Sequence, residues 1–354
     1  PNFYSFGCTA QKYYLCSRNI ETALEIREIL KDFSVGLSPM EAVTTPVFRH
    51  ICKRYGADVL FSEFISSDAL FRNVESSIKK MTFSEEERPV AIQIFGNKEE
   101  SLCEAAKLAE QANPDFIDIN WGCPVRKIAG KGCGSGILND IPKMISLTAA
   151  VVKAVRIPVS VKTRIGYSDE DKPIVEVAER LQDVGVQLLS IHGRTRSQMY
   201  KGSADWTLIG RVKDNQRMHI PIFGNGDIDS AEKLMEYKNR YGVDGILIGR
   251  AAMGNPFIFA QSKQLLEGKT ITPISVKERV KVCKEHLEGL RRWRGERYAL
   301  LEMRKFYSGY FKELKNFKPY RIQLVTTNSY DEIEAILSSV EDNLEYDQVM
   351  QNNK

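Results

Sequence analysis

Residues 118–136, DINWGCPVRKIAGKGCGSG, combine chemically capable side chains with a large amount of bare backbone. Asn120 offers an amide and Cys123 offers a thiol. The same stretch contains five glycines, Gly122, Gly130, Gly132, Gly134 and Gly136. An unperturbed thiol has a pKa of about 8.5, so at neutral pH it is mostly protonated and can deliver a proton. The residue type also allows two other roles for Cys123, a packed small apolar residue or a covalent nucleophile.

Two glycine-containing turns predict a phosphate site. The segments GNGDI (224–228) and IGRAA (248–252) each follow an apolar run, and the first contains Asn225, Gly226 and Asp227. Glycines such as Gly226 and Gly249 let the main chain approach a ligand closely, and Arg250 adds a cation that can pair with phosphate. A tight turn alone would explain either segment. Two such turns, after the last two strands of a barrel, favour phosphate binding.

Three further polar residues favour an organic cofactor. Gln93, Lys162 and His192 each lie inside or at the end of an apolar run. The sequence has no HxH or CxxC pattern that would indicate a metal site. FMN needs a hydrogen-bonding amide at the ring edge and a cation that stabilises its reduced ring. Gln93 and Lys162 suit these two roles, so we predict bound FMN and no metal.

Eight short apolar runs alternate with amphipathic stretches, which predicts parallel βαβ units. The runs span residues 35–39, 58–64, 89–95, 116–121, 158–164, 187–193, 220–226 and 244–250. Eight units over about 220 residues predict a (β/α)8 TIM barrel of the α/β class. A doubly wound sheet is the alternative, but it would place a glycine-rich turn after the first strand. The segment SPMEAVTTPVFRH contains no glycine, which favours the barrel.

A barrel brings the C-terminal ends of all its strands to one face, where catalytic groups gather. The expected strand ends supply Pro39, Met40, Gln93, Asn120, Cys123, Lys162, Arg164, His192, Arg194, Asn225, Gly226, Asp227, Gly249 and Arg250. We therefore expect these residues to surround one cavity.

The chain divides into three segments. Residues 1–34 form an N-terminal extension to which we assign no role, residues 35–268 form the barrel, and residues 269–354 form a helical bundle. Fourteen Lys and Arg residues lie between 277 and 321, with aromatic residues interleaved. A basic helix is more often only a solvated face, but this density of cations also suits a polyanion.

Composition sets broad limits. The chain has 354 residues, is 43% hydrophobic and carries a formal net charge of +4. Its seven cysteines are odd in number, which argues against a disulfide framework. No apolar run approaches the roughly 20 residues of a membrane span, and the first residues lack the pattern of a signal peptide. We therefore expect a cytoplasmic protein with reduced thiols and no membrane contact, and we make no prediction of its oligomeric state.

Taken together, the motifs resemble those of the tRNA-dihydrouridine synthases, and most closely the bacterial B-type branch. The resemblance begins with DINWGCP and the Gly-Ser that follows it. It extends through SPMEAVTTPVFR, VAIQIFG, VSVKTRIG, SIHGRTRSQMYKGSADW, IFGNGDI and ILIGRAAMGNP, and so covers about residues 35 to 320.

This resemblance implies a flavin-dependent reduction of uridine in tRNA to 5,6-dihydrouridine, with NADPH as the reductant. Cys123 matches the cysteine that protonates C5 of the uracil, while hydride reaches C6 from FMN. Asn120 matches an asparagine that contacts the uracil, and Arg164 and Arg194 match residues near the base. The flavin shell is implied to include Pro39, Met40, Gln93, Lys162, His192, Asn225, Gly226, Asp227, Gly249 and Arg250. The helical segment is implied to bind tRNA.

Two other functions are compatible with parts of the sequence. An FMN barrel that reduces a free pyrimidine would share the phosphate turns, but it would not need a basic helical segment. A non-catalytic RNA-binding protein would not need Cys123, Lys162 and His192.

Overall fold

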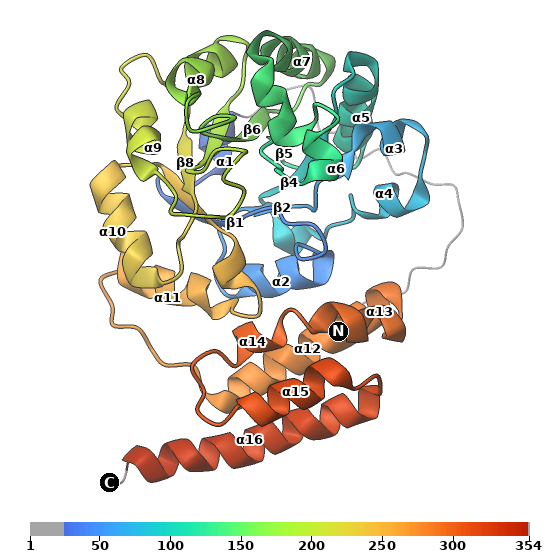
Figure 1. The fold of residues 1–354 in the computed structure, drawn as a ribbon, viewed down its shortest axis with the longest axis vertical. Helices are drawn as coiled ribbons and strands as arrows, with labels where there is room; N and C mark the ends of the chain where they lie inside the picture. The colour runs from blue at the N-terminus through green and yellow to red at the C-terminus, as the bar shows by residue number, and fades with distance from the viewer. Residues whose placement is uncertain (1–24, 353–354) are drawn as a thin grey trace.

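The computed structural model describes the backbone of residues 25–352 and the side chains of residues 25–344. Helices surround a parallel sheet, and a further group of helices packs on one side of it (Figure 1). The strands are β1 (Ser34–Leu37), β2 (Leu60–Phe61), β3 (Ile65–Ser66), β4 (Val90–Phe95), β5 (Phe116–Trp121), β6 (Val159–Arg164), β7 (Leu188–His192), β8 (Ile222–Asn225) and β9 (Gly245–Ile248). The predicted TIM barrel with C-terminal helices is confirmed.

The sheet closes between its first two strands. All neighbouring strands pair in parallel, in the order β1-β9-β8-β7-β6-β5-β4-β2, and the short β3 pairs with β4. A bridge between Gly36 and Val59 joins β1 to the chain before β2, and the Leu37 N–H donates to the Val59 carbonyl at 3.1 Å. A Cβ at Gly36 would lie 2.7 Å from a Val59 methyl, so glycine permits this close approach.

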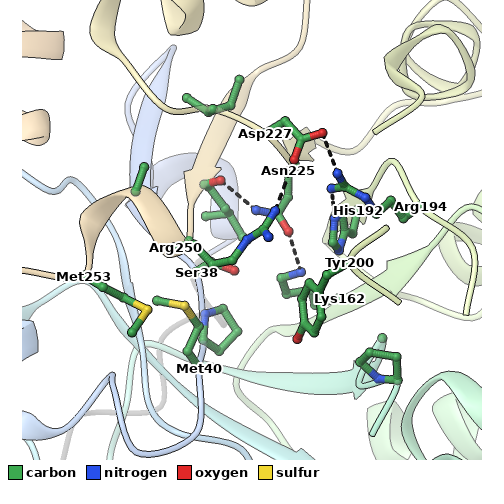
Figure 2. Close-up of a pocket in the computed structure, with 18 of the residues that line it drawn as sticks. Ser38, Met40, Lys162, His192, Arg194, Tyr200, Asn225, Asp227, Arg250 and Met253 are labelled. Atoms are coloured by element: carbon green, nitrogen blue, oxygen red, sulfur yellow. Dashed lines mark hydrogen bonds and ion pairs between the residues drawn. The ribbon is translucent and has the colours of Figure 1, made fainter. Parts of the chain in front are cut away.

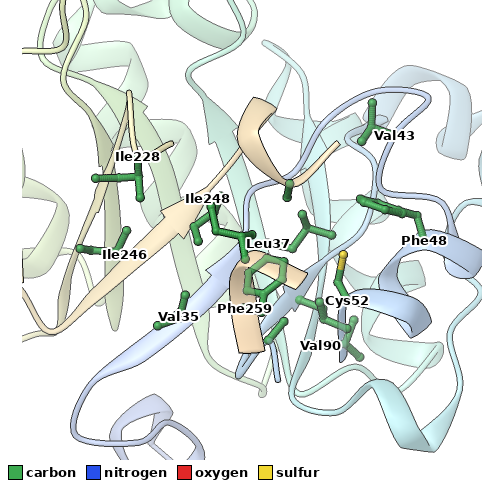
Figure 3. Packing of buried hydrophobic residues seen from close by; sticks show 14 of the residues in the cluster. Val35, Leu37, Val43, Phe48, Cys52, Val90, Ile228, Ile246, Ile248 and Phe259 are labelled. Carbon is green, nitrogen blue, oxygen red and sulfur yellow. The ribbon is translucent and has the colours of Figure 1, made fainter. Parts of the chain in front are cut away.

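The helices of the barrel lie between its strands in the chain or after the last one, and the longer ones each bury an apolar face. They are α2 (Pro46–Arg54), α3 (Ser67–Phe71), α4 (Glu75–Lys79), α5 (Glu99–Gln111), α6 (Arg126–Ala129), α7 (Ile141–Ala154), α8 (Ile174–Asp183), α9 (Trp206–Lys213), α10 (Ala231–Tyr241) and α11 (Phe257–Leu266), with 3-10 turns η1 (Glu85–Glu87), η2 (Gly134–Asn139) and η3 (Arg250–Ala252). In α5 the buried positions Leu102, Ala105 and Ala109 recur at helical spacing. Figure 3 shows how Phe48 and Cys52 of α2 and Phe259 of α11 pack near Leu37 and Ile248.

Part of the N-terminal extension fills the barrel from the end opposite the strand C-termini. The short helix α1 (Ile26–Ile29) buries Ile26 completely against Val59, Phe61 and Phe223. The Ile26 N–H also donates to the Gln187 amide oxygen at 3.0 Å. This gives a packing role to residues 25–34, whereas residues 1–24 lie outside the described part of the chain.

The C-terminal helices pack on the barrel through α2. They are α12 (Val276–Arg294), α13 (Glu296–Met303), α14 (Tyr307–Tyr310), α15 (Lys318–Thr326) and α16 (Tyr330–Asn352). The Phe48 ring stacks on the His286 ring of α12 at a centroid distance of 5.1 Å. At the edge of the contact both Arg54 terminal nitrogens donate to the Glu285 carboxylate at 2.6 Å. Within residues 25–352 no helix combines the length and the apolar character that crossing a membrane would need.

Candidate active site

A cavity of about 900 Å³ opens at the C-terminal ends of the strands. Thirteen of the fourteen expected site residues line it, and Gln93 alone among them does not. Figure 2 shows Lys162, His192 and Asn225 projecting from neighbouring strands toward the same space, with Met40 and Met253 on another wall. The helical domain also reaches the rim, because Gly309 and Lys312 are among the lining residues.

Asn120 holds the loop that carries Cys123. Its Oδ1 atom accepts the Gly122 N–H at 3.0 Å and the Cys123 N–H at 2.8 Å, so the chain turns sharply after β5. The Cys123 carbonyl in turn accepts both the backbone N–H and the hydroxyl of Ser135. Gly134 has a φ of 52°, and a Cβ there would lie 2.8 Å from the Cys123 carbonyl oxygen. Glycine is therefore required where the two arms of the loop touch.

The Cys123 side chain is suited to keeping its proton. The residue is 8% exposed, and burial raises the pKa of its thiol above the ordinary value, although Arg164 and Lys162 act in the opposite direction. A buried thiol with a raised pKa is a weak nucleophile and stays protonated at neutral pH. The raised pKa disfavours the nucleophile, and the position of Cys123 at the cavity favours a proton donor over a packed residue.

Gln93 lies one level deeper in the barrel than the cavity. It pairs in register with Asp118, two residues before Asn120 on β5, and it is fully buried. Its Nε2 donates to an Asp118 carboxylate oxygen at 2.5 Å, and its Oε1 accepts from Asn120 Nδ2 at 2.8 Å. Both ends of the amide thus have partners inside the protein.

Lys162 and His192 both line the cavity, and burial lowers the pKa of both side chains. Lys162 Nζ donates to Asn225 Oδ1 at 3.0 Å, and burial lowers the pKa of the amine to about 8. Burial, aided by Arg164 and other cations, holds the pKa of His192 well below its ordinary value, so the imidazole is neutral. Arg194 approaches His192 Nε2 at 3.4 Å and can only donate, which makes Nε2 the acceptor and leaves the proton on Nδ1.

Arg164 links the cysteine loop to the loop that follows β7. Its Nε donates to the Gly122 carbonyl at 2.7 Å, and one terminal nitrogen donates to the carbonyls of Thr195 and Met199 at 2.9 Å. Its guanidinium also lies 5.7 Å from the centre of the Tyr200 ring. Arg164 lines the cavity while its hydrogen bonds hold two of the cavity walls together.

The Asp227 carboxylate forms ion pairs with two arginines, Arg194 and Arg250, at the phosphate turns. It accepts from Arg194 at 2.7 Å, from Arg250 at 3.2 Å and from the Ala204 N–H at 2.8 Å. Burial alone would raise the pKa of Asp227, but these hydrogen bonds and the two cations outweigh it and the pKa is lowered. Arg194 is only 2% exposed and also donates to the carbonyls of the 201–202 segment.

The two turns offer backbone donors to a ligand. Within the described chain, the N–H groups of Gly226, Asp227, Gly249 and Arg250 have no backbone acceptor. Gly226 has a φ of 122°, and a Cβ there would collide with Ala204 and with the His192 ring. The donors and Arg250 line one wall of the cavity, which is the arrangement expected for a phosphate.

Several lining residues were not expected from the sequence. Tyr200 is 51% exposed at the rim, between Arg164 and Arg250. Its only sequence signal is an aromatic residue in a polar loop. Gly309 and Lys312 come from the helical domain, and although Lys312 is one of its fourteen basic residues, the place of both at the cavity depends on how that domain packs.

Comparison with known proteins agrees with this geometry. The model of the dihydrouridine synthase family matches residues 36–345. The chain belongs to the dihydrouridine synthase family. It is 36% identical to tRNA-dihydrouridine synthase B of Pseudomonas aeruginosa over 305 residues, which cover 86% of this chain and 90% of the relative.

A second relative extends this similarity. The probable tRNA-dihydrouridine synthase 1 of Synechocystis sp. is 35% identical over 316 residues, which cover 89% of this chain and 88% of the relative. Among solved structures, an old yellow enzyme homologue from Zymomonas mobilis matches 70% of this chain and 91% of its own, with 12% identity and a TM-score of 0.47. Membership of the dihydrouridine synthase family makes this chain an oxidoreductase.

Proposed function

We propose that this chain reduces uridine in tRNA to 5,6-dihydrouridine, with FMN in the cavity, NADPH as the reductant and Cys123 as the acid. The observation that carries the proposal is the position of Cys123, which lines the same cavity as the phosphate turns and Lys162. One cavity therefore contains both the proposed proton donor and the proposed cofactor site.

The residues present fit a flavin nucleotide. The N–H groups of Gly226 and Gly249, together with Arg250, would hold its phosphate, and Lys162 would lie against its ring. When bound, FMN supplies the hydride that C6 of the uracil receives, and NADPH returns the flavin to its reduced form. Lys162 keeps much of its charge at neutral pH because its pKa is about 8, so it can stabilise a reduced anionic ring. His192 stays neutral beside it and adds no second charge.

Cys123 completes the reduction from the other side. Hydride addition at C6 places negative charge on C5 and the neighbouring carbonyl, and the thiol donates its proton to C5. The turn fixed by Asn120 points the cysteine into the cavity. Asn120 keeps one Nδ2 hydrogen free beyond its bond to Gln93, so it can donate to a uracil carbonyl. Tyr200 offers an exposed ring at the rim for stacking.

A uridine within folded tRNA must leave its stack to enter this cavity. The rim therefore has to accept RNA backbone, and the helical domain reaches the rim through Gly309 and Lys312, whose exposed side chain also pairs with Glu313 at 3.3 Å. We propose residues 269–354 as the tRNA-binding domain. A free pyrimidine would need no such rim, and this disfavours a free-base reductase.

The tRNA contact involves only some of the basic residues of this domain. Lys284 pairs with Glu334 at 3.3 Å, and Arg292 pairs with Glu288 at 2.8 Å. By contrast, Lys318 and Arg321 lie one turn apart on α15 and are exposed. Among the residues that the structure describes, neither has an ion-pair partner. Their charges are available to phosphate, and we assign the tRNA contact to this side of α15.

The decisive experiment compares two cysteines of equal burial. Cys123 and Cys133 are both 8% exposed. Cys123→Ala should lower dihydrouridine formation in unmodified tRNA by about 10²- to 10⁴-fold, the usual contribution of a general acid. Cys133→Ala should stay within about twofold of the wild type. Mass spectrometry of the tRNA digest detects the two added hydrogens. Unchanged reduction of tRNA by Cys123→Ala would reject the assignment, and turnover of free uracil would favour the free-base enzyme.

A further inference from the structure

A continuous line of buried hydrogen bonds runs from the barrel interior to the loop that carries Cys123. Asp118 accepts from Gln93 Nε2 at 2.5 Å, Gln93 Oε1 accepts from Asn120 Nδ2 at 2.8 Å, and Asn120 Oδ1 accepts the Cys123 N–H at 2.8 Å. Asp118 and Gln93 are fully buried, and Asn120 is 5% exposed. The line starts on β5, crosses to β4 and returns to β5.

The backbone N–H groups at the Cys123 end of this line determine which atom donates and which accepts in every one of its hydrogen bonds. The N–H groups of Gly122 and Cys123 can only donate, so Asn120 must present its oxygen to them and its nitrogen to Gln93. Gln93 must then present its oxygen to Asn120 and its nitrogen to Asp118. The last position therefore requires an acceptor, and a carboxylate provides one.

We propose that Asp118 and Gln93 are positioning residues that fix the amide of Asn120 and, through it, the Cys123 loop. The inference rests on the proposed function, because it concerns the orientation of the proposed proton donor, Cys123. Neither residue lines the cavity. The inference gives Gln93 a role that differs from the flavin contact expected from the sequence.

The surroundings of Asp118 are consistent with this role. Ser160 of β6 donates to the second carboxylate oxygen, and Lys162 of β6 is the charged group nearby. Burial raises the pKa of Asp118 to about 6, while the bonds from Gln93 and Ser160 pull it down. At pH 7.5 the group is ionised, so both of its oxygens are acceptors.

An exchange of the two groups tests the proposal. Gln93→Glu places a second carboxylate against Asp118 and removes the donor. Adding Asp118→Asn restores every bond with the same net charge as the wild type, because the new amide at position 118 donates to the new carboxylate at position 93. We expect Gln93→Glu to lower kcat for tRNA reduction by about 30-fold, with KM for tRNA nearly unchanged, and the double variant to return to within about threefold of the wild type. Asp118→Asn alone, which still accepts from Gln93, is the milder control.

Two further readouts separate positioning from a simple packing role. The kcat of Gln93→Glu should recover as the pH is lowered, because protonation gives the new side chain back a donor. Alkylation of Cys123 by iodoacetamide should be about tenfold faster in Gln93→Glu than in the wild type, and normal in the double variant. Cys133, measured in the same digest, serves as the internal reference.

The outcomes distinguish this inference from the proposed function. If the double variant stays as impaired as Gln93→Glu, or if Gln93→Glu alters neither kcat nor Cys123 alkylation, the positioning role is refuted. Should Gln93→Glu be too unstable to purify, the double variant alone decides, since the proposal requires it to fold and reduce tRNA. If the wild type does not reduce tRNA, the proposed function fails, but the alkylation pattern still reports whether the bonds hold the loop.

Discussion

The assignment of tRNA contacts to α15 leads to a quantitative prediction. Lys318→Ala combined with Arg321→Ala removes two exposed cations that have no ion-pair partner in the described chain. If each neutralises one phosphate, the slope of log K against log salt should become shallower by about 0.9 per residue, or about 1.8 in total. Extrapolated to about 0.15 M salt, a slope change of 1.8 corresponds to a loss of roughly 30-fold in affinity.

The assay is tRNA binding at several salt concentrations between about 50 and 200 mM, measured by fluorescence anisotropy. The matched control is Lys284→Ala combined with Arg292→Ala, which removes the same charge from side chains already paired with Glu334 and Glu288. The control should change the slope by less than half as much. Equal changes in both double variants, or no change in the α15 variant, would refute the argument that unpaired cations mark the tRNA surface.

Three further predictions concern the site and its support. The charged form of Lys162 declines as the pH rises through about 8, so the rate of tRNA reduction should fall above pH 8. Lys162→Arg should move this fall to higher pH. Identical pH–rate profiles for the wild type and the variant would contradict the role of the Lys162 charge. Gly134→Ala should lower the free energy of unfolding by about 2 kcal/mol or more and slow catalysis. Gly132→Ala is the control, because Gly132 has a similar positive φ but no atom closer than 3.7 Å to the added Cβ, and it should cost less. Equal losses in chemical denaturation would show that the contact between Gly134 and the Cys123 carbonyl does not matter. Arg49→Ala should destabilise the barrel by about 3–5 kcal/mol, because it leaves Glu87 buried and unpaired, and a change below about 1 kcal/mol would show that Glu87 finds another partner.

Local chemistry was readable from the sequence. The eight apolar runs predict eight of the nine strands, because these strands are buried along almost all of their length, and only the two-residue β3 lies outside the runs. The turns at Gly226 and Gly249 and the placement of Cys123 after Asn120 follow from short segments, and they come together because every strand of a barrel ends at the same face. These features need only the order of residues along the chain and the periodicity of the elements.

The tertiary structure decided how deeply each polar side chain lies and which groups it pairs with. Gln93 reads as a strand-end amide, but the register with Asp118 places it below the cavity and engages both of its polar atoms. The resemblance implies that Arg194 lies near the uracil, yet Asp227 and the loop carbonyls accept hydrogen bonds from its guanidinium. A list of basic residues cannot show which of them are paired across helices. The sequence by itself determined which groups are available for chemistry, and packing determined which of them remain free, because a hydrogen bond or ion pair depends on distances between residues that are far apart in the chain.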